Sequence, residues 1–336
     1  MQLGLSENLS ALVARRFKAA KEGNHLVFSS TKLSIINAGI PYQLRYCPAL
    51  AKKPNNLKPS GPKAPKPDPF ENPSPDLLIT TLPSTNPTHA LILNKFPVIP
   101  NHFILATTAW ASQTDLLDKS DLDATYECLH AWTENHPGRL FAFFNSGDES
   151  GASQPHRHLQ FLPVEAMRAD SNPNEFWEPL IDGFKSQPQS QGKFQHLPHL
   201  PLAHFALPVP ADATPEILYH IYITLYRAAV AAVEGNAATN IATSGAARIS
   251  YNLAMTLSTM MIVPRRAETG TVPIDMEKVR DIADPGVVSL NGTVLAGTLM
   301  VKAEAEWDVL RAKPEVLGRV LREVGFPRER EGVALL

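Results

Sequence analysis

The sequence predicts an α+β protein built from two diverged halves, and three observations support this fold class. The chain has 336 residues, 44% of them apolar, which suffices for two subdomains or one large unit with a well-filled core. Helix-like segments alternate along the chain with short β-rich runs. Two of these runs end in similar residues, at 98–101 and at 263–265, which hints at two copies of one α+β unit.

Helices and strands are predicted from periodicity and from the residues at their ends. Thr214 and Pro215 precede an apolar run that Gly235 can end, which matches the preferences for an N-cap, a first helical residue and a terminating glycine. Ser120 is predicted to open a second helix that runs through Trp132. The other predicted helices cover residues 6–23, 304–311 and 315–324, and predicted strands include 90–93 and the run 249–263.

Two proline-rich stretches indicate how the chain is divided. Residues 54–75 predict an irregular surface loop, because proline prevents regular pairing. A second irregular stretch at 163–215 predicts a boundary near residue 200. The two halves therefore cover residues 1–200 and 201–336, and only the first carries the histidine motif described below.

Composition and charge narrow the class of protein. The net charge is −2 and the pI about 6.6, with no basic stripe, so nucleic-acid binding has little support and a free nucleotide is the better candidate polyanion. The two cysteines, Cys47 and Cys128, form no C-x-x-C pair, which indicates neither a disulfide framework nor a thiolate zinc site. No apolar run approaches the roughly 20 residues that span a bilayer, and no targeting segment is evident. The expected location is the cytoplasm, with the nucleus as a second compartment.

The sequence His-Arg-His-Leu-Gln at 156–160 is the candidate catalytic motif of the chain. Because side chains alternate along an extended strand, His156, His158 and Gln160 project from one face. Neutral imidazole can attack phosphorus and leave again, while a second imidazole and a carboxamide orient it. An isolated His-x-His is more often a surface pair or a fortuitous metal site. The Gly- and Ser-rich segment 144–153, whose backbone N–H groups can approach a phosphate, favours nucleotidyl transfer here.

This motif resembles the histidine-triad superfamily, and the whole chain resembles the fungal-type diadenosine tetraphosphate phosphorylases, or ATP adenylyltransferases, of the galactose-1-phosphate uridylyltransferase-like branch. Four blocks carry the resemblance, at residues 42–54, 93–102, 145–160 and 289–302, and the third is highly specific. The resemblance implies a histidine-triad-like α+β fold in which two halves with antiparallel sheet form a pseudo-dimer. One active site per chain follows, because only one half carries His-x-His.

Carried over residue by residue, the family pattern implies roles for individual side chains. His158 would be the nucleophile that takes up AMP, His156 its orienting neighbour, and Gln160 a contact of the phosphate in the covalent intermediate. Lysines along the phosphates suit the about four negative charges of a dinucleoside tetraphosphate, although each alone reads equally well as a surface lysine. Further substrate contacts are implied at Asn94, Lys95, Asn145, Gly151, Ala152, Ser153, Gln154, Asn291, Gly292, Thr293, Thr298 and Lys302, and at one of Lys52 and Lys53, of which we choose Lys53.

The implied activity is reversible phosphorolysis of diadenosine tetraphosphate to ATP and ADP through an adenylyl-histidine intermediate, with ADP sulfurylase activity as a further expectation. Hydrolytic relatives usually carry histidine at the position of Gln160, so we expect transfer to phosphate over transfer to water. A divalent cation, Mg²⁺, is expected to bind with the substrate phosphates, and neither structural zinc nor a protein metal site is expected. The expected partners are these nucleotides and phosphate, without nucleic acid or membrane, and the chain is expected to be a monomer.

Three other functions remain open from the sequence. A histidine-triad dinucleotide or phosphoramidate hydrolase would use His158 without a phosphate acceptor and would turn over without phosphate. A hexose-1-phosphate uridylyltransferase would turn over UDP-glucose, and the absence of zinc-spaced cysteines disfavours it. A non-catalytic nucleotide-binding protein would bind tightly without becoming adenylylated, and the intact His158 argues against it.

Overall fold

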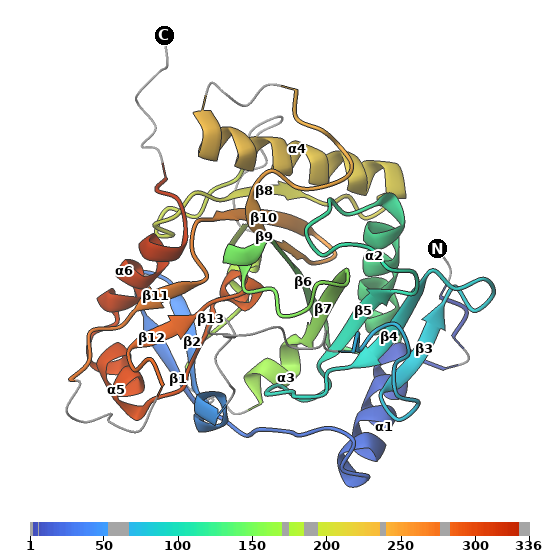
Figure 1. Ribbon diagram of the computed structural model, residues 1–336, viewed down its shortest axis with the longest axis horizontal. Helices are drawn as coiled ribbons and strands as arrows, with labels where there is room; N and C mark the ends of the chain where they lie inside the picture. The colour runs from blue at the N-terminus through green and yellow to red at the C-terminus, as the bar shows by residue number, and fades with distance from the viewer. Residues whose placement is uncertain are drawn as a thin grey trace.

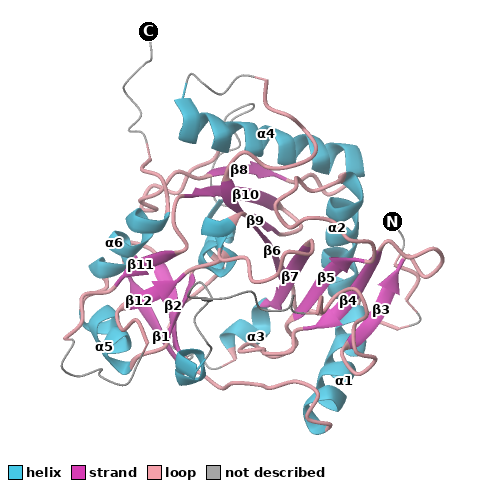
Figure 2. Ribbon diagram, in the orientation of Figure 1, coloured by secondary structure: helices cyan, strands magenta, loops and turns pink. Residues whose placement is uncertain are grey.

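The computed structural model describes residues 3–5, 7–52, 67–169, 175–184, 194–235, 240–275 and 283–328 (Figure 1). An eight-stranded sheet runs in the order β3 (Leu78–Leu82), β4 (His89–Leu93), β5 (Phe103–Thr107), β7 (His158–Pro163), β6 (Leu140–Ser146), β9 (Ser250–Met255), β10 (Thr259–Arg265) and β8 (Phe205–Pro208). All neighbouring pairs in it are antiparallel. Figure 2 shows these strands as one continuous series from β3 to β8. The predicted α+β class with an antiparallel sheet is therefore confirmed.

Three helices cover one face of this sheet: α1 (Leu9–Glu22), α2 (Lys119–Thr133) and α4 (Pro215–Glu234). Helix α1 contacts β3 and β4, α2 contacts β6, and α4 contacts β8 and β10. Alternate strand residues, among them Leu91, Leu105 and Leu159, point into this layer because the side-chain period of a strand is two. No helix in the described ranges combines the length and the hydrophobicity needed to cross a membrane.

The opposite face of the sheet is covered unevenly. Over β6, β9 and β10 lies a second buried cluster that includes Phe143, Ala254 and Met261. Around this cluster pack β1 (Lys32–Asn37), β2 (Pro41–Tyr46), β11 (Thr269–Thr271), β12 (Val287–Ser289), β13 (Thr298–Val301), α3 (Val164–Arg168), α5 (Glu304–Ala312) and α6 (Glu315–Val324). Among the described residues, a small cluster built around Phe70 covers this face over β4 and β5. Phe70 lies over the β7 residue His158 on this face and helps to keep it buried.

The two halves form one body. The first half contributes β3 to β7, the second contributes β8 to β10, and they join where β6 pairs with β9. Helices α2 and α4, one from each half, contact one another. This arrangement confirms the predicted pseudo-dimer of two α+β halves. The N-terminal hairpin also reaches across, because β2 pairs in parallel with β13. The boundary near residue 200 stays a prediction, and both large core clusters contain residues from either side of it.

The predicted helices are present, and one of them begins differently. Helix α4 follows the capping residue Thr214 and ends at Gly235, as predicted. Helix α2 begins after Asp118, so the prediction that Ser120 opens it was wrong. The reason is a local acidic pair, because the carboxylate of Asp121 accepts a hydrogen bond from the backbone N–H of Asp118 at 2.7 Å.

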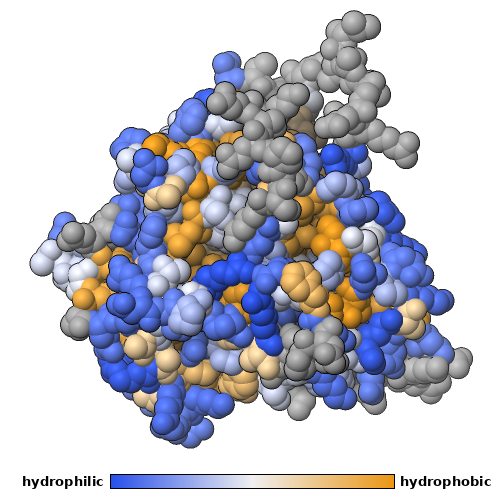
Figure 3. Space-filling model, turned by 180° about the vertical axis from the view of Figure 1, so that it is seen from behind, coloured by the Kyte–Doolittle hydropathy of each residue, from blue (hydrophilic) through white to orange (hydrophobic). Residues whose placement is uncertain are grey.

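Three further expectations are corrected or left aside. The run 249–263 forms two strands, β9 and β10, which pair as a hairpin. The resemblance between the ends of two runs has no structural counterpart, because residues 98–101 form a turn whereas Pro264 lies within β10. Most of the predicted loop at 54–75 lies outside the described residues, and Phe70 within it is buried rather than on the surface. Seen from behind, the hydrophilic surface is interrupted by separate hydrophobic areas (Figure 3).

Candidate active site

The histidine motif enters the sheet through β7, which lies between β5 and β6. His158 and Gln160 occupy alternate positions that pair with β5. His158 contacts Phe70 on the thinly covered face, whereas Leu159 belongs to the core under the helices. The strand therefore has the alternation predicted from the sequence. His158 and Gln160 occupy successive positions on the same face of β7.

Arg157 anchors the strand from the helix side. Its Nη1 atom donates to Asp118 Oδ2 at 2.8 Å and to Asp121 Oδ2 at 2.9 Å, both at the start of α2. The other oxygen of Asp121 lies 2.9 Å from Nε2 of His89 on β4. Buried charges require partners of this kind. The ion-paired group ties β7 to α2 and β4 directly behind the nucleophile.

His158 is held as a neutral imidazole. Its Nδ1 atom lies 2.9 Å from the backbone carbonyl oxygen of His156, and a carbonyl can only accept, so Nδ1 carries the proton. In the neutral ring the lone pair is then on Nε2, and within the described ranges no hydrogen bond occupies that atom. Burial lowers the pKa of His158 to about 4. At neutral pH the side chain therefore presents a free lone pair to an electrophile.

His156 acts on His158 through its backbone and not through its ring. Nδ1 of His156 lies 2.6 Å from Oδ2 of Asp68, and Nε2 lies 2.9 Å from Oγ1 of Thr107. The carboxylate accepts from Nδ1, so the ring is fixed between the two side chains. Fixing this residue fixes the carbonyl that receives the His158 proton, which gives the predicted orienting neighbour a defined geometry.

Gln160 is oriented by a buried histidine. Nδ2 of Asn94 lies 3.2 Å from Nδ1 of His102, and Nε2 of His102 lies 3.0 Å from Oε1 of Gln160. Burial lowers the pKa of His102 to about 4, so its ring is neutral. The amide of Asn94 donates to Nδ1, which places the proton of His102 on Nε2, facing the oxygen of Gln160. The NH₂ group of Gln160 therefore points away from His102, and its contact with a phosphate stays a prediction.

Two aromatic residues flank the histidines. The ring centroid of Phe70 lies 5.0 Å from that of His158 and 5.8 Å from that of His156. Trp110 lies 5.1 Å from His156 and is 62% exposed. Phe70 is buried and keeps water from one side of the nucleophile, whereas Trp110 offers an open aromatic face beside it.

Asn145 is shared between the two halves of the chain. Its Oδ1 atom accepts from the backbone N–H of Gly292 at 2.8 Å and from Nδ2 of Asn252 at 2.9 Å. A Cβ atom at Gly292 would lie 2.8 Å from Oδ1 of Asn145, so this approach needs glycine. Gly151 has a φ of 76°, and a Cβ there would lie 2.6 Å from the carbonyl oxygen of Leu290. Motif blocks far apart in the sequence thus meet at one place.

Two other predicted substrate contacts of the C-terminal block, Asn291 and Thr298, lie in different settings. Oδ1 of Asn291 accepts from the backbone N–H of Thr293 at 3.0 Å and caps a short 3-10 turn over Gly292–Ala296. Thr298 is buried in β13, where its Oγ1 lies 3.3 Å from Oε1 of Gln43 on β2. In this structure Thr298 supports the pairing of two strands, and its contact with substrate stays a prediction.

The predicted lysines lie at strand ends. Lys95 is exposed in the turn after β4, next to Asn94. Lys302 follows β13, and its backbone N–H donates to Oε2 of Glu306 at 3.0 Å. Because β2 and β13 are parallel, Lys302 and the turn Pro48–Lys52 leave the small sheet at the same edge. Lys53 lies outside the described residues.

Loop residues that precede the strand complete the predicted set. Ala152, Ser153 and Gln154 connect the 3-10 turn Asp148–Ser150 to β7. Ser153 is exposed, and the other two are partly buried. The loop begins beside Asn145 and ends at His156, so it borders both the nucleophile and the junction with the second half.

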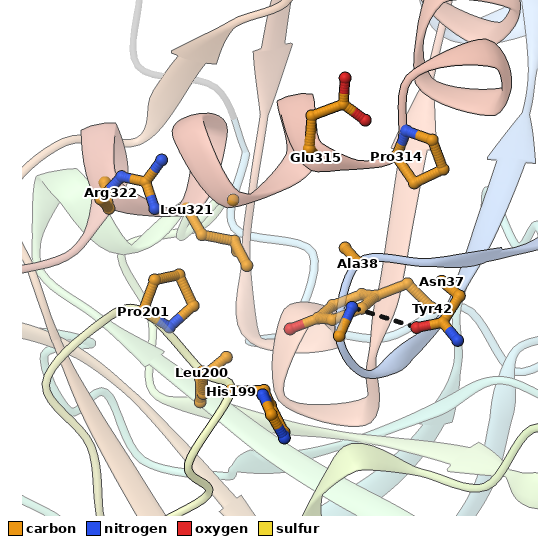
Figure 4. Close-up of a pocket in the computed structure, with 12 residues that line it drawn as sticks. Asn37, Ala38, Tyr42, His199, Leu200, Pro201, Pro314, Glu315, Leu321 and Arg322 are labelled. Atoms are coloured by element: carbon orange, nitrogen blue, oxygen red, sulfur yellow. Dashed lines mark hydrogen bonds between the residues drawn. The ribbon is translucent and has the colours of Figure 1, made fainter.

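A cavity of about 420 Å³ lies elsewhere, between the β1–β2 turn, residues 199–201 and α6. Figure 4 shows Tyr42, His199 and Arg322 around it, and none of its lining residues is a predicted site residue. In the parts of the chain that the structure describes, no three His, Cys, Asp or Glu side chains are grouped to hold a metal ion. We therefore locate the candidate active site by the hydrogen bonds around His158, and not by this cavity or by a metal-binding cluster.

Two family models match the chain in succession. One, described as the Ap4A phosphorylase N-terminal domain, matches residues 3–176, and the other, described as the ATP adenylyltransferase C-terminal domain, matches residues 198–327. The chain belongs to the Ap4A phosphorylase family. Family membership confirms the resemblance inferred from the four sequence blocks.

Individual relatives match almost end to end. Diadenosine 5',5'''-P1,P4-tetraphosphate phosphorylase 2 of Saccharomyces cerevisiae is 29% identical over 96% of both chains, and Protein APA1 of the same organism is 28% identical over 97% of this chain and 96% of its own. The crystal structure of yeast Ap4A phosphorylase Apa2 matches with a TM-score of 0.78 at 25% identity, covering 97% of this chain and all of Apa2. Apa2 in complex with AMP and with Ap4A matches with a TM-score of 0.75.

For this member of the Ap4A phosphorylase family the structure adds residues that the motifs did not single out. Asp68, His102, Gln113 and Asn252 all contact motif residues, and each comes from another part of the chain. Asn252 carried a sequence signal, because it is a polar residue inside an otherwise buried strand. His102 ends the sequence block at 93–102, whereas Asp68 and Gln113 carry no local signal, since their partners are set by the fold.

Proposed function

We propose that the protein cleaves diadenosine tetraphosphate with inorganic phosphate, giving ATP and ADP. The observation that carries this proposal is the neutral imidazole of His158, with Nδ1 fixed on a carbonyl and Gln160 at the next position on the same face of β7. Membership in the Ap4A phosphorylase family supports it, as does the likeness to Apa2, which has been crystallised with Ap4A.

In the first step Nε2 of His158 attacks the α-phosphorus of the dinucleotide. A nitrogen–phosphorus bond forms, the bond from phosphorus to the bridging oxygen breaks, and ATP leaves with that oxygen. Positive charge develops on the imidazole, and the carbonyl of His156 stabilises it through the Nδ1 proton. The NH₂ group of Gln160 and nearby backbone N–H groups receive the charge on the phosphoryl oxygens.

In the second step an oxygen of inorganic phosphate attacks the same phosphorus. The nitrogen–phosphorus bond breaks, ADP forms, and His158 regains its lone pair. Two inversions give net retention at phosphorus. Phe70 covers one side of the adduct and lowers its exposure to water, which favours phosphate as the acceptor.

The requirement for a metal ion follows from the substrate. The described residues hold no cluster of metal-binding side chains, and Asp68 is already paired with His156. Mg²⁺ bound to the oxygens of the phosphate chain would lower its negative charge. We propose that the cation enters with the nucleotide. A monomeric state, a cytoplasmic location and use of sulfate as acceptor stay predictions from the sequence.

The decisive experiment is intact mass spectrometry after mixing the protein with diadenosine tetraphosphate in phosphate-free buffer. We expect the mass of one AMP on the wild-type protein, its release as ADP when phosphate is added, and no adduct on His158→Ala. If the adduct is too short-lived to detect, release of ATP and ADP that depends on phosphate would support the same reaction. If the protein forms no adduct and shows no turnover, the proposal is rejected in favour of a non-catalytic binding protein.

The same assay separates phosphorylase from hydrolase. Turnover without phosphate would favour the hydrolase. A Gln160→His variant tests why the acceptor is phosphate, and we expect it to gain hydrolysis. A variant that remains strictly dependent on phosphate would show that Gln160 does not select the acceptor.

A further inference from the structure

Gln113 lies between His158 and Asn145, a predicted substrate contact. It belongs to a segment after β5 that runs beside the histidine motif, because Arg157 N donates to Ala111 O and Gln113 N donates to Pro155 O, each at 2.8 Å. The side chain is buried. This backbone pairing aims the carboxamide of Gln113 at the gap between β6 and β7.

The carboxamide of Gln113 bridges β6 and β7 beyond the point where their backbone pairing ends. The β6–β7 pairing ends at Phe143 opposite Gln160, and the next pair on this face would be Asn145 opposite His158. Gln113 takes that place: its Oε1 accepts from the backbone N–H of His158 at 2.7 Å, and its Nε2 donates to the carbonyl of Asn145 at 2.7 Å and to the carbonyl of His158 at 3.2 Å. The strands separate where the phosphate must enter between their functional side chains.

We propose that Gln113 is a positioning residue that sets the distance between His158 and Asn145 for phosphoryl transfer. This inference rests on the proposed function. Gln113 touches only backbone atoms of the two functional residues, so it acts through them. Its role needs an acceptor and a donor on the same short planar group, because one backbone N–H and two carbonyls converge on it.

The inference predicts a loss in rate and a smaller loss in binding. Without the carboxamide the two strands are free to close or to drift, and a displacement of about 1 Å at reacting atoms can cost about 100-fold in rate. Nucleotide affinity depends on contacts that remain in place, and the Nδ1 proton of His158 keeps its carbonyl partner.

The experiment compares Gln113→Met, which conserves volume but not hydrogen bonding, with Gln195→Met as a matched control. Gln195 is also buried, and its side chain faces the carbonyl of Phe184, outside the site. Single-turnover adenylylation by diadenosine tetraphosphate without phosphate, nucleotide affinity and thermal stability are measured for each. We expect an adenylylation rate about 100-fold lower for Gln113→Met only, with nucleotide affinity largely kept. Equal rates for the two variants at matched stability would overturn the inference.

A second variant keeps the test decisive if Gln113→Met does not fold. Gln113→Glu retains the acceptor for His158 N–H, but its carboxylate cannot donate to the carbonyl of Asn145. Protonation restores one donor, so the rate of this variant relative to wild type should rise as the pH falls. A ratio that is flat with pH would overturn the inference. A wild-type chain without adduct or turnover would overturn the proposed function, and this inference with it.

Discussion

The Nε2 atom of His102 lies 3.0 Å from Oε1 of Gln160, so a buried neutral imidazole fixes the orientation of that carboxamide. Gln160 in turn lies one position along the same face from the nucleophile. The orientation of the Gln160 amide is thus set by a buried residue from another part of the chain.

Removing His102 should therefore weaken catalysis more than binding. In His102→Ala the carboxamide of Gln160 can rotate and present its oxygen to the phosphate, and we expect kcat to fall about 10- to 100-fold, with a smaller change in KM. Steady-state kinetics measure this. His204→Ala is the control, because it also removes a buried imidazole, one that bonds to backbone atoms of Leu197 and Leu202. An unchanged kcat in His102→Ala would contradict the orienting role.

The adenylylation rate should be level through neutral pH and should decline only in acid. The nucleophile is the neutral ring, and burial lowers the pKa of His158 to about 4, so protonation removes the lone pair only near that pH. Rapid-quench measurement of adduct formation across pH would test this. A decline centred at the ordinary histidine value of about 6.5 would mean that His158 is solvated in the working enzyme.

Removing Phe70 should shift that decline to higher pH. The ring of Phe70 lies over His158, and Phe70→Ala would admit water to the imidazole. Because burial is what lowers the pKa of His158, hydration raises it toward its ordinary value. The acid decline of the adenylylation rate should move upward in Phe70→Ala. The control is Phe176→Ala, an exposed phenylalanine, which should leave the profile unmoved.

The free energy of unfolding should fall as the pH drops below about 6.5, the ordinary pKa of histidine. Burial lowers the pKa values of His102, His158 and His204 to about 4 each. Their unfolded forms take up protons near pH 6.5, before the folded protein does, so the free energy of unfolding is full above 6.5 and declines between 6.5 and 4. Each group contributes roughly 3 kcal/mol to that decline at its acid limit.

Urea denaturation at several pH values would measure the decline. A His204→Leu variant, which lacks one of the three groups, should show a shallower dependence on pH than the wild type. Equal slopes would mean that His204 titrates normally in the folded protein.

Two glycines provide a test of the junction between the halves. A Cβ at Gly292 would lie 2.6 Å from Phe143 and 2.8 Å from Oδ1 of Asn145, so Gly292→Ala should destabilise the fold by about 1–3 kcal/mol and also reduce activity. Gly318→Ala in α6 meets only the end of Arg322, at 3.6 Å, and should stabilise by roughly 0.5–1 kcal/mol. Denaturation midpoints measure both. Similar midpoints for the two variants would show that the junction tolerates a methyl group.

The sequence predicted the features that local rules determine. The face shared by His158 and Gln160 follows from a period of two, and the ends of α4 follow from Thr214 and Gly235. The start of α2 was missed because Ser120 is also a good capping residue, and the acidic pair Asp118 and Asp121 on either side of it competes with it. Family resemblance, and not physical pattern, supplied the substrate.

Contacts across long separations could not be predicted this way. Asp68 reaches His156 over 88 positions, His102 reaches Gln160 over 58, and Asn252 reaches Asn145 over 107. Such pairs leave no periodic trace, because the fold alone brings them together. Lys53 and the residues after it lie outside the described residues, so the choice between Lys52 and Lys53 stays a prediction.

The junction of β6 with β9 has a consequence for synthesis of the chain. During translation the strand with His158 emerges well before Asn252 and Gly292, the two residues that hold Asn145. A nascent first half therefore carries His158 while Asn145 still lacks both of these partners. The order of the halves along the gene delays assembly of the site until nearly the whole protein has left the ribosome.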